Sequence, residues 1–90
     1  MNLEHPRLAE GVRLRFDGVR DSHVLLFPEG ALKLNSTAAA VLELCDGERS
    51  LDQISALLSE RYDGADVRGD VESLLEAIAV RGLVVGDGDA

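Results

Sequence analysis

The chain has 90 residues, 46% of them hydrophobic and only three of them aromatic, which provides one small core and excludes a multidomain protein. Its formal net charge of −8 disfavours nucleic acid and anionic membrane surfaces as partners, because both attract clustered Lys and Arg. One cysteine, Cys45, permits no internal disulfide and fits a reducing compartment. With no apolar run of about 20 residues and no apolar N-terminal segment, a cytoplasmic protein is expected.

The first half of the chain predicts an arm and three strands. Residues 1–11 are polar and contain His5-Pro6, which disfavours helix, so a flexible N-terminal arm is expected. Beyond the arm, alternating or continuous apolar residues bounded by turn residues are typical of strands. These segments are residues 12–16, 24–27 and 31–34. Pro28-Glu29-Gly30 predicts a tight hairpin turn between the second and third strands.

After residue 34 the hydrophobic period changes from that of a strand to that of a helix. Residues 35–37, Asn-Ser-Thr, offer several side-chain oxygens that can cap the start of a first helix. Gly47 is suited to the left-handed position beyond its end. Ser50 and Gln53 have the spacing of a capping box and predict the start of a second helix.

A third helix follows Asp63-Gly64 and is expected to end at Arg81-Gly82. Its apolar residues recur at helical spacing, namely Val67, Val71, Leu74, Leu75 and Ile78. Residues 83–85 are expected to pack back on the core as a short extended piece. Residues 86–90 are expected to form a flexible acidic tail, which leaves residues 12–85 as the folded domain.

Three strands followed by three helices indicate an α+β fold. Neither half can bury its apolar face alone, so the helices are expected to cover one side of a three-stranded antiparallel meander. A three-helix cluster attached to a small sheet is a winged helix-turn-helix-like arrangement.

The sequence contains no residues arranged for catalysis or metal binding. His5 and His23 are isolated, and neither has a Cys or carboxylate at a ligand spacing nearby. Cys45 completes the apolar stripe of the first helix, which indicates a buried thiol rather than a nucleophile. There is no phosphate loop, dinucleotide fingerprint or Cys-x-x-Cys motif. We therefore expect no enzyme activity, no catalytic residue, no metal and no cofactor.

The helix-turn-helix likeness raises the possibility of DNA binding. A recognition helix presents Arg, Lys, Asn or Gln to the bases and the phosphates. The third helix here has only Arg68 and Arg81 among four acidic residues. The pattern therefore disfavours DNA binding.

The third strand, residues 31–34, is an edge of the predicted meander. An extended peptide can add to such an edge as a further strand through backbone hydrogen bonds. The alternative is that Lys33 only protects a bare edge against aggregation. Periodicity alone favours this second interpretation.

Several segments of the chain resemble the PqqD family, the pyrroloquinoline quinone (PQQ) biosynthesis protein D. The resemblance extends from His5-Pro6 to Gly82-Leu83. Its most specific parts are LLFPEG at 25–30, LNSTA at 34–38, LCDG at 44–47 and DV at 70–71.

The resemblance implies a peptide chaperone that is not an enzyme. Members of the family bind a ribosomally made precursor peptide and present it to a radical S-adenosylmethionine (SAM) enzyme, and the same fold recurs as the recognition element of other peptide-modifying pathways (the RiPP recognition element). The peptide adds to the third strand and rests against the third helix. Carried over to this chain, the peptide-binding residues are Ala31, Leu32, Lys33, Leu34, Asn35, Ser73, Leu74, Ala77 and Arg81. Arg81 either meets a peptide carboxylate or caps its own helix.

Two other functions stay open at this point: a leader-recognition domain of a different peptide-modifying pathway and a helix-turn-helix transcriptional adaptor. The chain is expected to be a monomer, although the exposed edge allows a domain-swapped dimer. Its net negative charge predicts a basic docking patch on the partner enzyme and a salt-sensitive complex.

Overall fold

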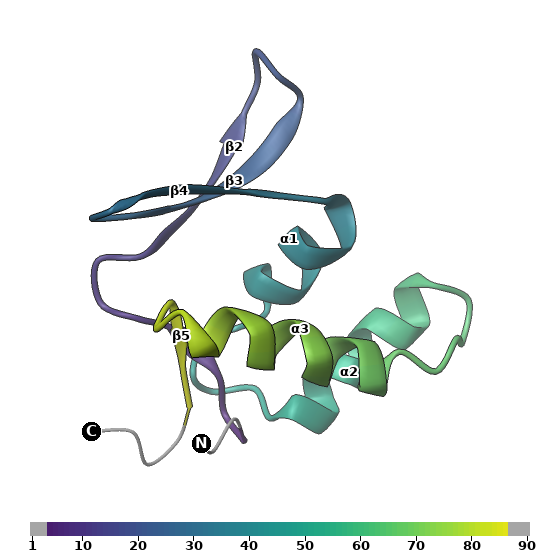
Figure 1. Ribbon diagram of the computed structural model, residues 1–90. Coiled ribbons are helices and arrows are strands. Elements are labelled where there is room, and N and C mark those ends of the chain that lie inside the picture. The colour runs from purple at the N-terminus through teal and green to yellow at the C-terminus, as the bar shows by residue number, and fades with distance from the viewer. Residues whose placement is uncertain (1–3, 87–90) are drawn as a thin grey trace.

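The computed structural model describes residues 4–86, in which a three-stranded antiparallel sheet packs against three helices (Figure 1). In chain order the elements are β1 (Arg7–Leu8), β2 (Arg13–Asp17), β3 (Ser22–Phe27), β4 (Gly30–Leu34), α1 (Ser36–Glu43), α2 (Leu51–Arg61), α3 (Arg68–Val80) and β5 (Val84–Val85). The predicted α+β class is confirmed, and the three predicted strands correspond to β2, β3 and β4.

The sheet has the order β2-β3-β4, and its register separates an apolar face from a polar one. Leu14, Leu25 and Leu32 lie directly opposite one another, so their side chains point to the same face. Leu25 is completely buried, which identifies this as the inner face, toward the helices. The next set of paired residues, Arg15, Val24 and Lys33, directs its side chains to the opposite, outer face.

Helices α1 and α2 begin where the capping residues predicted. The Asn35 side-chain oxygen accepts a hydrogen bond from the Ala38 N–H at 2.7 Å and caps α1. At α2 the Ser50 hydroxyl accepts from the Gln53 N–H, while the Gln53 side chain accepts from the Ser50 N–H, at 3.0 and 2.8 Å. The capping box is therefore confirmed. Gly47 follows α1 with a φ of 83°, the left-handed conformation that the sequence predicted.

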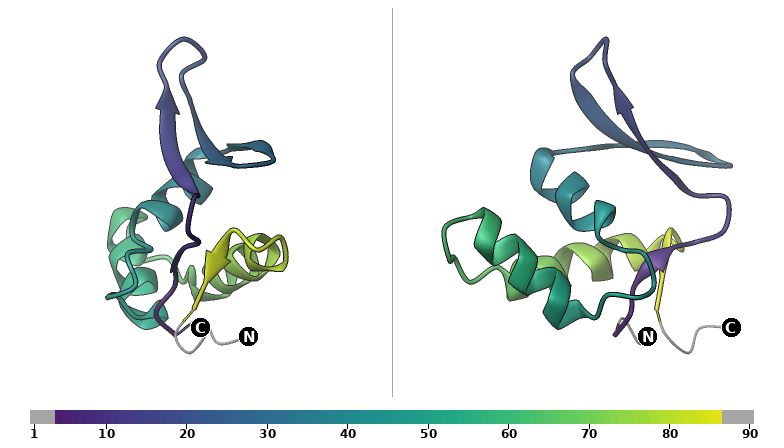
Figure 2. Two further views of the ribbon diagram at one scale, coloured as in Figure 1. Left: turned by 90° about the vertical axis from the view of Figure 1, so that its left-hand side faces the viewer. Right: turned by 180° about the vertical axis from the view of Figure 1, so that it is seen from behind.

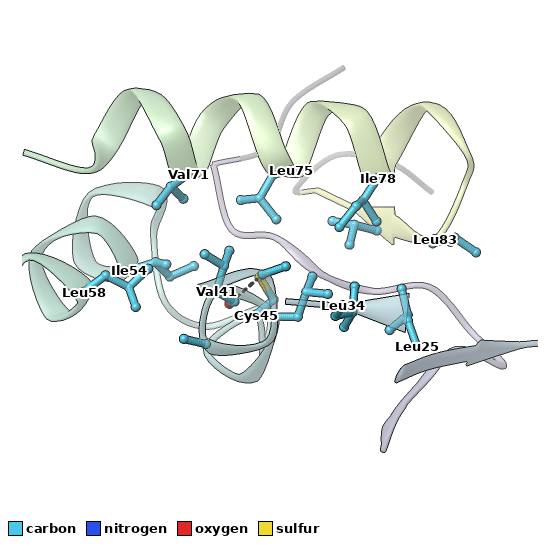
Figure 3. Packing of buried hydrophobic residues seen from close by; sticks show 14 residues of the cluster. Leu25, Leu34, Val41, Cys45, Ile54, Leu58, Val71, Leu75, Ile78 and Leu83 are labelled. Atoms are coloured by element: carbon cyan, nitrogen blue, oxygen red, sulfur yellow. Dashed lines mark hydrogen bonds between the residues drawn. The ribbon is translucent and has the colours of Figure 1, made fainter. Parts of the chain in front are cut away.

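One hydrophobic core joins the sheet to all three helices (Figure 3). Leu25 from β3, Ile54 from α2 and Leu75 from α3 are each 0% exposed. Figure 3 shows Val41 of α1, and Cys45 just beyond the end of that helix, among the side chains of this cluster. Because α1 lies between the sheet and the other helices, its small alanine side chains allow a close approach on both sides.

The sequence predicted a flexible arm over residues 1–11; residues 1–3 lie outside the described residues, and residues 4–11 differ from that prediction. Strand β1 pairs antiparallel with β5, at the other end of the described chain. The Gly47 N–H donates to the Pro6 carbonyl at 3.0 Å, and Pro6 itself is fully buried. A short polar segment carries no hydrophobic period, and its partners are distant in sequence, so local patterns could not show this docking.

The C-terminal end packs against the core as expected. Leu83 and Val84 are 5% and 1% exposed, and Val84 belongs to β5. Gly86, which the sequence assigned to a flexible tail, is buried. The rest of that predicted tail, residues 87–90, lies outside the described residues.

Leu25 and Leu26 are adjacent in sequence but lie on opposite faces of the sheet, which makes them a matched pair for testing the register. We expect Leu25→Ala to lower the free energy of unfolding by about 2–5 kcal/mol, because it leaves a cavity in the core. Leu26 is 37% exposed, and its replacement by Ala is expected to cost less than about 1 kcal/mol. Urea unfolding of both variants measures the difference, and equal costs would contradict the register.

Candidate functional site

Strand β4 forms one edge of the sheet within residues 4–86. It pairs with β3 on one side, and the short β1-β5 pair belongs to a separate sheet. In an antiparallel pair, alternate residues direct their N–H and C=O groups away from the partner strand. The outer edge of β4 therefore presents unpaired backbone donors and acceptors, as the sequence predicted for residues 31–34.

The predicted strand residues differ in what they can offer a ligand. Ala31 and Lys33 are exposed on the outer face of the sheet, whereas Leu32 is half-buried against the core. Leu34 is 6% exposed, so only its backbone is accessible. Asn35 is exposed, but its side-chain oxygen is already bound to α1 as the N-cap.

The predicted residues of α3 form one stripe on its surface. Ser73, Ala77 and Arg81 follow one another at intervals of four, and Leu74 precedes Ala77 by three, so the four lie along the same side of the helix. Ser73, Ala77 and Arg81 are exposed. Leu74 is half-buried and packs against the core cluster, so its side chain lines the site from below.

One contact and one shared pocket relate the two ends of this stripe to the two ends of β4. The Arg81 guanidinium carbon is 5.9 Å from the centre of the Phe27 ring, and Phe27 pairs with Gly30, the first residue of β4. At the other end of β4, Asn35 and Leu74 line the same pocket. The strand and the helix therefore run in opposite directions (Figure 1), and both lie on one side of the molecule (Figure 2, left).

A pocket of about 390 Å³ extends this site beyond the end of β4. It is mainly apolar and lies between the start of α1, the end of α2 and the first half of α3. Its lining residues are Asn35, Thr37, Ala38, Val41, Leu58, Tyr62, Ala65, Val67, Asp70, Val71 and Leu74. Asp70 is exposed, so a carboxylate lies at the pocket wall.

Sequence reasoning included Asn35 and Leu74 in the site but missed the rest of this pocket. The space depends on small side chains from different elements, such as Ala38 of α1 and Ala65 of the turn before α3. Alanines at separate positions give no local sign that they meet around a cavity. The one available signal was the polar Thr37 and Asp70 beside otherwise apolar helical faces.

Among the described residues, Cys45 and His23 are the side chains with the greatest potential reactivity. Burial, together with the negative charge of Asp46, raises the pKa of the Cys45 thiol to about 12. Its Sγ donates to the Val41 carbonyl at 3.3 Å, as the dashed line in Figure 3 shows. The His23 Nε2 is 3.7 Å from a Glu43 carboxylate oxygen. Over residues 4–86, no three His, Cys, Asp or Glu side chains gather in a way that could hold a metal ion.

Helix α3 also differs from a DNA-recognition helix because its arginines already contact other side chains of this chain. Arg68 is bound by Asp52 of α2 and by Glu72, whose carboxylate oxygen lies 3.2 Å from the arginine Nε. Arg81 lies over Phe27. Within the described part of the chain, no helix has the length and apolar character needed to cross a bilayer.

The fold and the site define a class: a small α+β recognition domain with an open strand edge beside its last long helix. The sequence model of one family, described as Coenzyme PQQ synthesis protein D (PqqD), matches residues 22–84. The chain is 48% identical over 67 residues to the PqqA binding protein of Klebsiella pneumoniae strain 342, covering 73% of each chain. This chain therefore belongs to the PqqD family, and the resemblance drawn from the sequence is confirmed.

Two further relatives agree with this membership. The chain is 46% identical over 76 residues to the bifunctional coenzyme PQQ synthesis protein C/D of Methylorubrum extorquens; the match covers 82% of this chain and 20% of that protein. The solution NMR structure of the PqqD truncation of Methylobacterium extorquens PqqCD superimposes with a TM-score of 0.78 at 41% identity. It covers 89% of this chain and 87% of that one, and is described as a functional, stand-alone RiPP recognition element.

The raised pKa of the Cys45 thiol predicts how the free energy of unfolding depends on pH. The thiol of the unfolded chain ionises near its ordinary pKa of 9.0, whereas that of the folded chain ionises near 12. Folding therefore favours the protonated thiol, and this contribution to stability is complete below pH 9 and is lost as the pH rises toward 12.

We expect Cys45→Ala to remove this part of the pH dependence, which urea unfolding of both proteins between pH 8 and pH 10.5 measures as a difference in slope. Native protein should also react slowly with iodoacetamide at pH 8 and rapidly in urea, as mass spectrometry would show. Fast alkylation of the native protein would contradict a buried thiol.

Proposed function

We propose that the chain is a peptide chaperone of PQQ biosynthesis, which binds the ribosomal precursor peptide and presents it to a radical SAM crosslinking enzyme. The unpaired edge of β4 beside the α3 stripe carries this proposal. The name PqqA binding protein, borne by a relative 48% identical to this chain, supports it. So does the description of the superimposable NMR structure as a RiPP recognition element.

In this proposal the peptide adds to β4 as a fourth strand of the sheet. About four backbone hydrogen bonds along such a short strand contribute roughly 0.5–1.5 kcal/mol each, a few kcal/mol in total. A micromolar affinity requires about −8 kcal/mol. Apolar side chains of the peptide must therefore supply the rest, by contact with Leu74 and by entering the pocket beyond Asn35.

The site residues in this proposal have separate roles. The strand Ala31–Leu34 and Asn35 supply backbone partners, and Lys33 adds a cation at the edge. Ser73, Leu74 and Ala77 form the helical wall. Arg81, which lies over Phe27 at the end of the stripe, pairs with a carboxylate of the peptide in this proposal.

The chemistry in this proposal belongs to the partner enzyme, which carries the SAM and the iron–sulfur centres. This chain contributes binding and orientation, raising the concentration of the peptide at the enzyme without making or breaking a bond. The buried thiol of Cys45, which is held in its protonated form, is not available as a nucleophile, and this supports a role without catalysis. A reduced, buried single cysteine also suits the cytoplasm, where we place the protein.

Strand addition predicts an alternating pattern of backbone contacts along the peptide. Two synthetic PQQ precursor peptides, N-methylated at either of two alternating sets of residues, would test it, because only one set directs its N–H groups to β4. We expect one set to weaken binding by about 10-fold or more and the other to leave it nearly unchanged, since each lost hydrogen bond costs about 1 kcal/mol. Isothermal titration with the unmodified protein measures both.

Equal effects of the two methylation patterns would contradict strand addition while leaving peptide binding intact. If the unmethylated PQQ precursor does not bind even with the enzyme present, the PQQ assignment fails. Binding of a leader peptide from another modifying pathway would then support recognition in that pathway. This is the second candidate function, because the similar NMR structure is described as a RiPP recognition element.

The α3 stripe can be tested with one substitution at two alanines. Ala77 lies on the stripe, whereas Ala56 lies on α2, away from the stripe and the pocket; both are exposed. Ala77→Arg places a long side chain in the path of the peptide and should weaken its binding by about 10-fold, whereas Ala56→Arg should change it by less than about 3-fold. Peptide titration of the two variants measures the contrast, and equal affinities would exclude α3 from the site.

A further inference from the structure

The outer face of the sheet carries two arginines that the peptide site does not use, Arg13 and Arg15, together with Lys33 of the peptide-binding edge. Strand register places Arg13, Leu26 and Ala31 opposite one another in one row. The alternation of side chains puts the row of Arg15, Val24 and Lys33 on the same face. We call these six residues the outer sheet face; the helices cover the opposite side of the sheet (Figure 1).

The three basic side chains of this face are exposed and form no ion pair within residues 4–86. Elsewhere Arg20, Arg49 and Arg68 are paired with carboxylates of the chain. Asp17 lies at the far end of the face, where its carboxylate accepts the N–H of Val19 and pairs with Arg20. The cations of the outer sheet face are therefore not neutralised internally.

This face is opposite in sign to the protein as a whole. Three of only nine Lys and Arg residues gather on it, in a chain with 17 acidic residues and a net charge of −8. Leu26, 37% exposed, and the half-buried Val24 add apolar surface between the cations. Apolar residues surrounded by charges of one sign are typical of a surface that meets a partner of the opposite sign.

We propose that the outer sheet face docks an acidic surface of the enzyme that receives the peptide. This inference rests on the proposed function. It reverses the expectation from net charge alone, which placed a basic patch on the enzyme. A peptide added to β4 continues the pleat of the sheet, so every second peptide side chain appears on this same face beside Lys33. An enzyme seated here therefore touches both the chaperone and the peptide.

Nucleic acid is the other polyanion that a cationic face could meet. The 17 acidic residues elsewhere on the chain repel a long phosphate backbone that extends beyond three cations. A compact acidic patch on a protein is matched to the size of this face. Duplex DNA is therefore an outcome of the test rather than the proposal.

Substitutions at Arg13 and Arg15 test docking without changing the peptide site, because both residues lie on β2, at the edge of the sheet opposite β4. The test uses the full chain unmodified, with Arg15→Glu, and with Arg13→Glu and Arg15→Glu together. Arg61→Glu is the matched control: this arginine is exposed in the last turn of α2 and gives the same change in net charge as Arg15→Glu. Arg15→Lys keeps the charge and should retain binding. Amide NMR spectra check that each variant is folded.

Affinity is measured first for the precursor peptide alone and then for the enzyme in the presence of saturating peptide. We expect every variant to bind peptide within about 2-fold of the unmodified chain, while the double variant binds enzyme at least about 10-fold more weakly at low salt. The enzyme affinity of Arg15→Glu should lie between those of the unmodified chain and the double variant. Arg61→Glu should change enzyme affinity by less than about 3-fold.

Loss of enzyme binding in Arg61→Glu equal to that in Arg15→Glu would overturn the proposal, because net charge alone would then explain it. Unchanged enzyme affinity in the double variant, or no binding of enzyme to the unmodified chain with peptide, would also overturn it. Duplex DNA bound by the unmodified chain and released by the double variant would assign the face to nucleic acid instead. Failure of the peptide itself to bind would be a failure of the proposed function, seen before enzyme is added.

Discussion

Burial of the inner face of the sheet against three helices is the constraint on which the other features depend. Leu25, at the centre of β3, is completely enclosed, and the rows beside it follow from antiparallel pairing. With this face buried, α1 lies beneath the sheet. Strand β3 is paired with a neighbouring strand along both of its edges, whereas β4 is paired along only one and forms an edge of the sheet. The core thus determines which backbone groups stay unpaired, and these are the groups from which the candidate site is made.

A site made from a strand edge has a particular chemical character. Its donors and acceptors are backbone groups, so it recognises an extended chain more than any one side chain. Selectivity must come from the surfaces on either side: the α3 stripe, with Arg81 over Phe27, and the pocket beyond Asn35. Reactive side chains are unnecessary for this role, which agrees with a buried Cys45 whose thiol is held in its protonated form.

The outer sheet face and the chain as a whole have charges of opposite sign. The chain is strongly acidic, yet the outer sheet face is cationic because the register places Arg13, Arg15 and Lys33 on it together. Net charge describes the long-range field of the molecule, whereas docking depends on the charges of the surface in contact. The two can therefore have opposite signs, and only the register shows where they differ.

The sequence by itself determined the elements whose signals are local: the three main strands, the Asn35 cap, the Ser50 capping box, the left-handed Gly47 and the edge position of residues 31–34. These depend on neighbouring residues and on the periods of strand and helix. The α3 residues of the site came from the family resemblance rather than from periodicity. Only the tertiary structure decided that β1 docks on β5, that Ala38 and Ala65 meet around a pocket, and that three cations share one face. These features join residues far apart in the chain, and contacts of that kind are set by packing and register, for which a local pattern carries no signal.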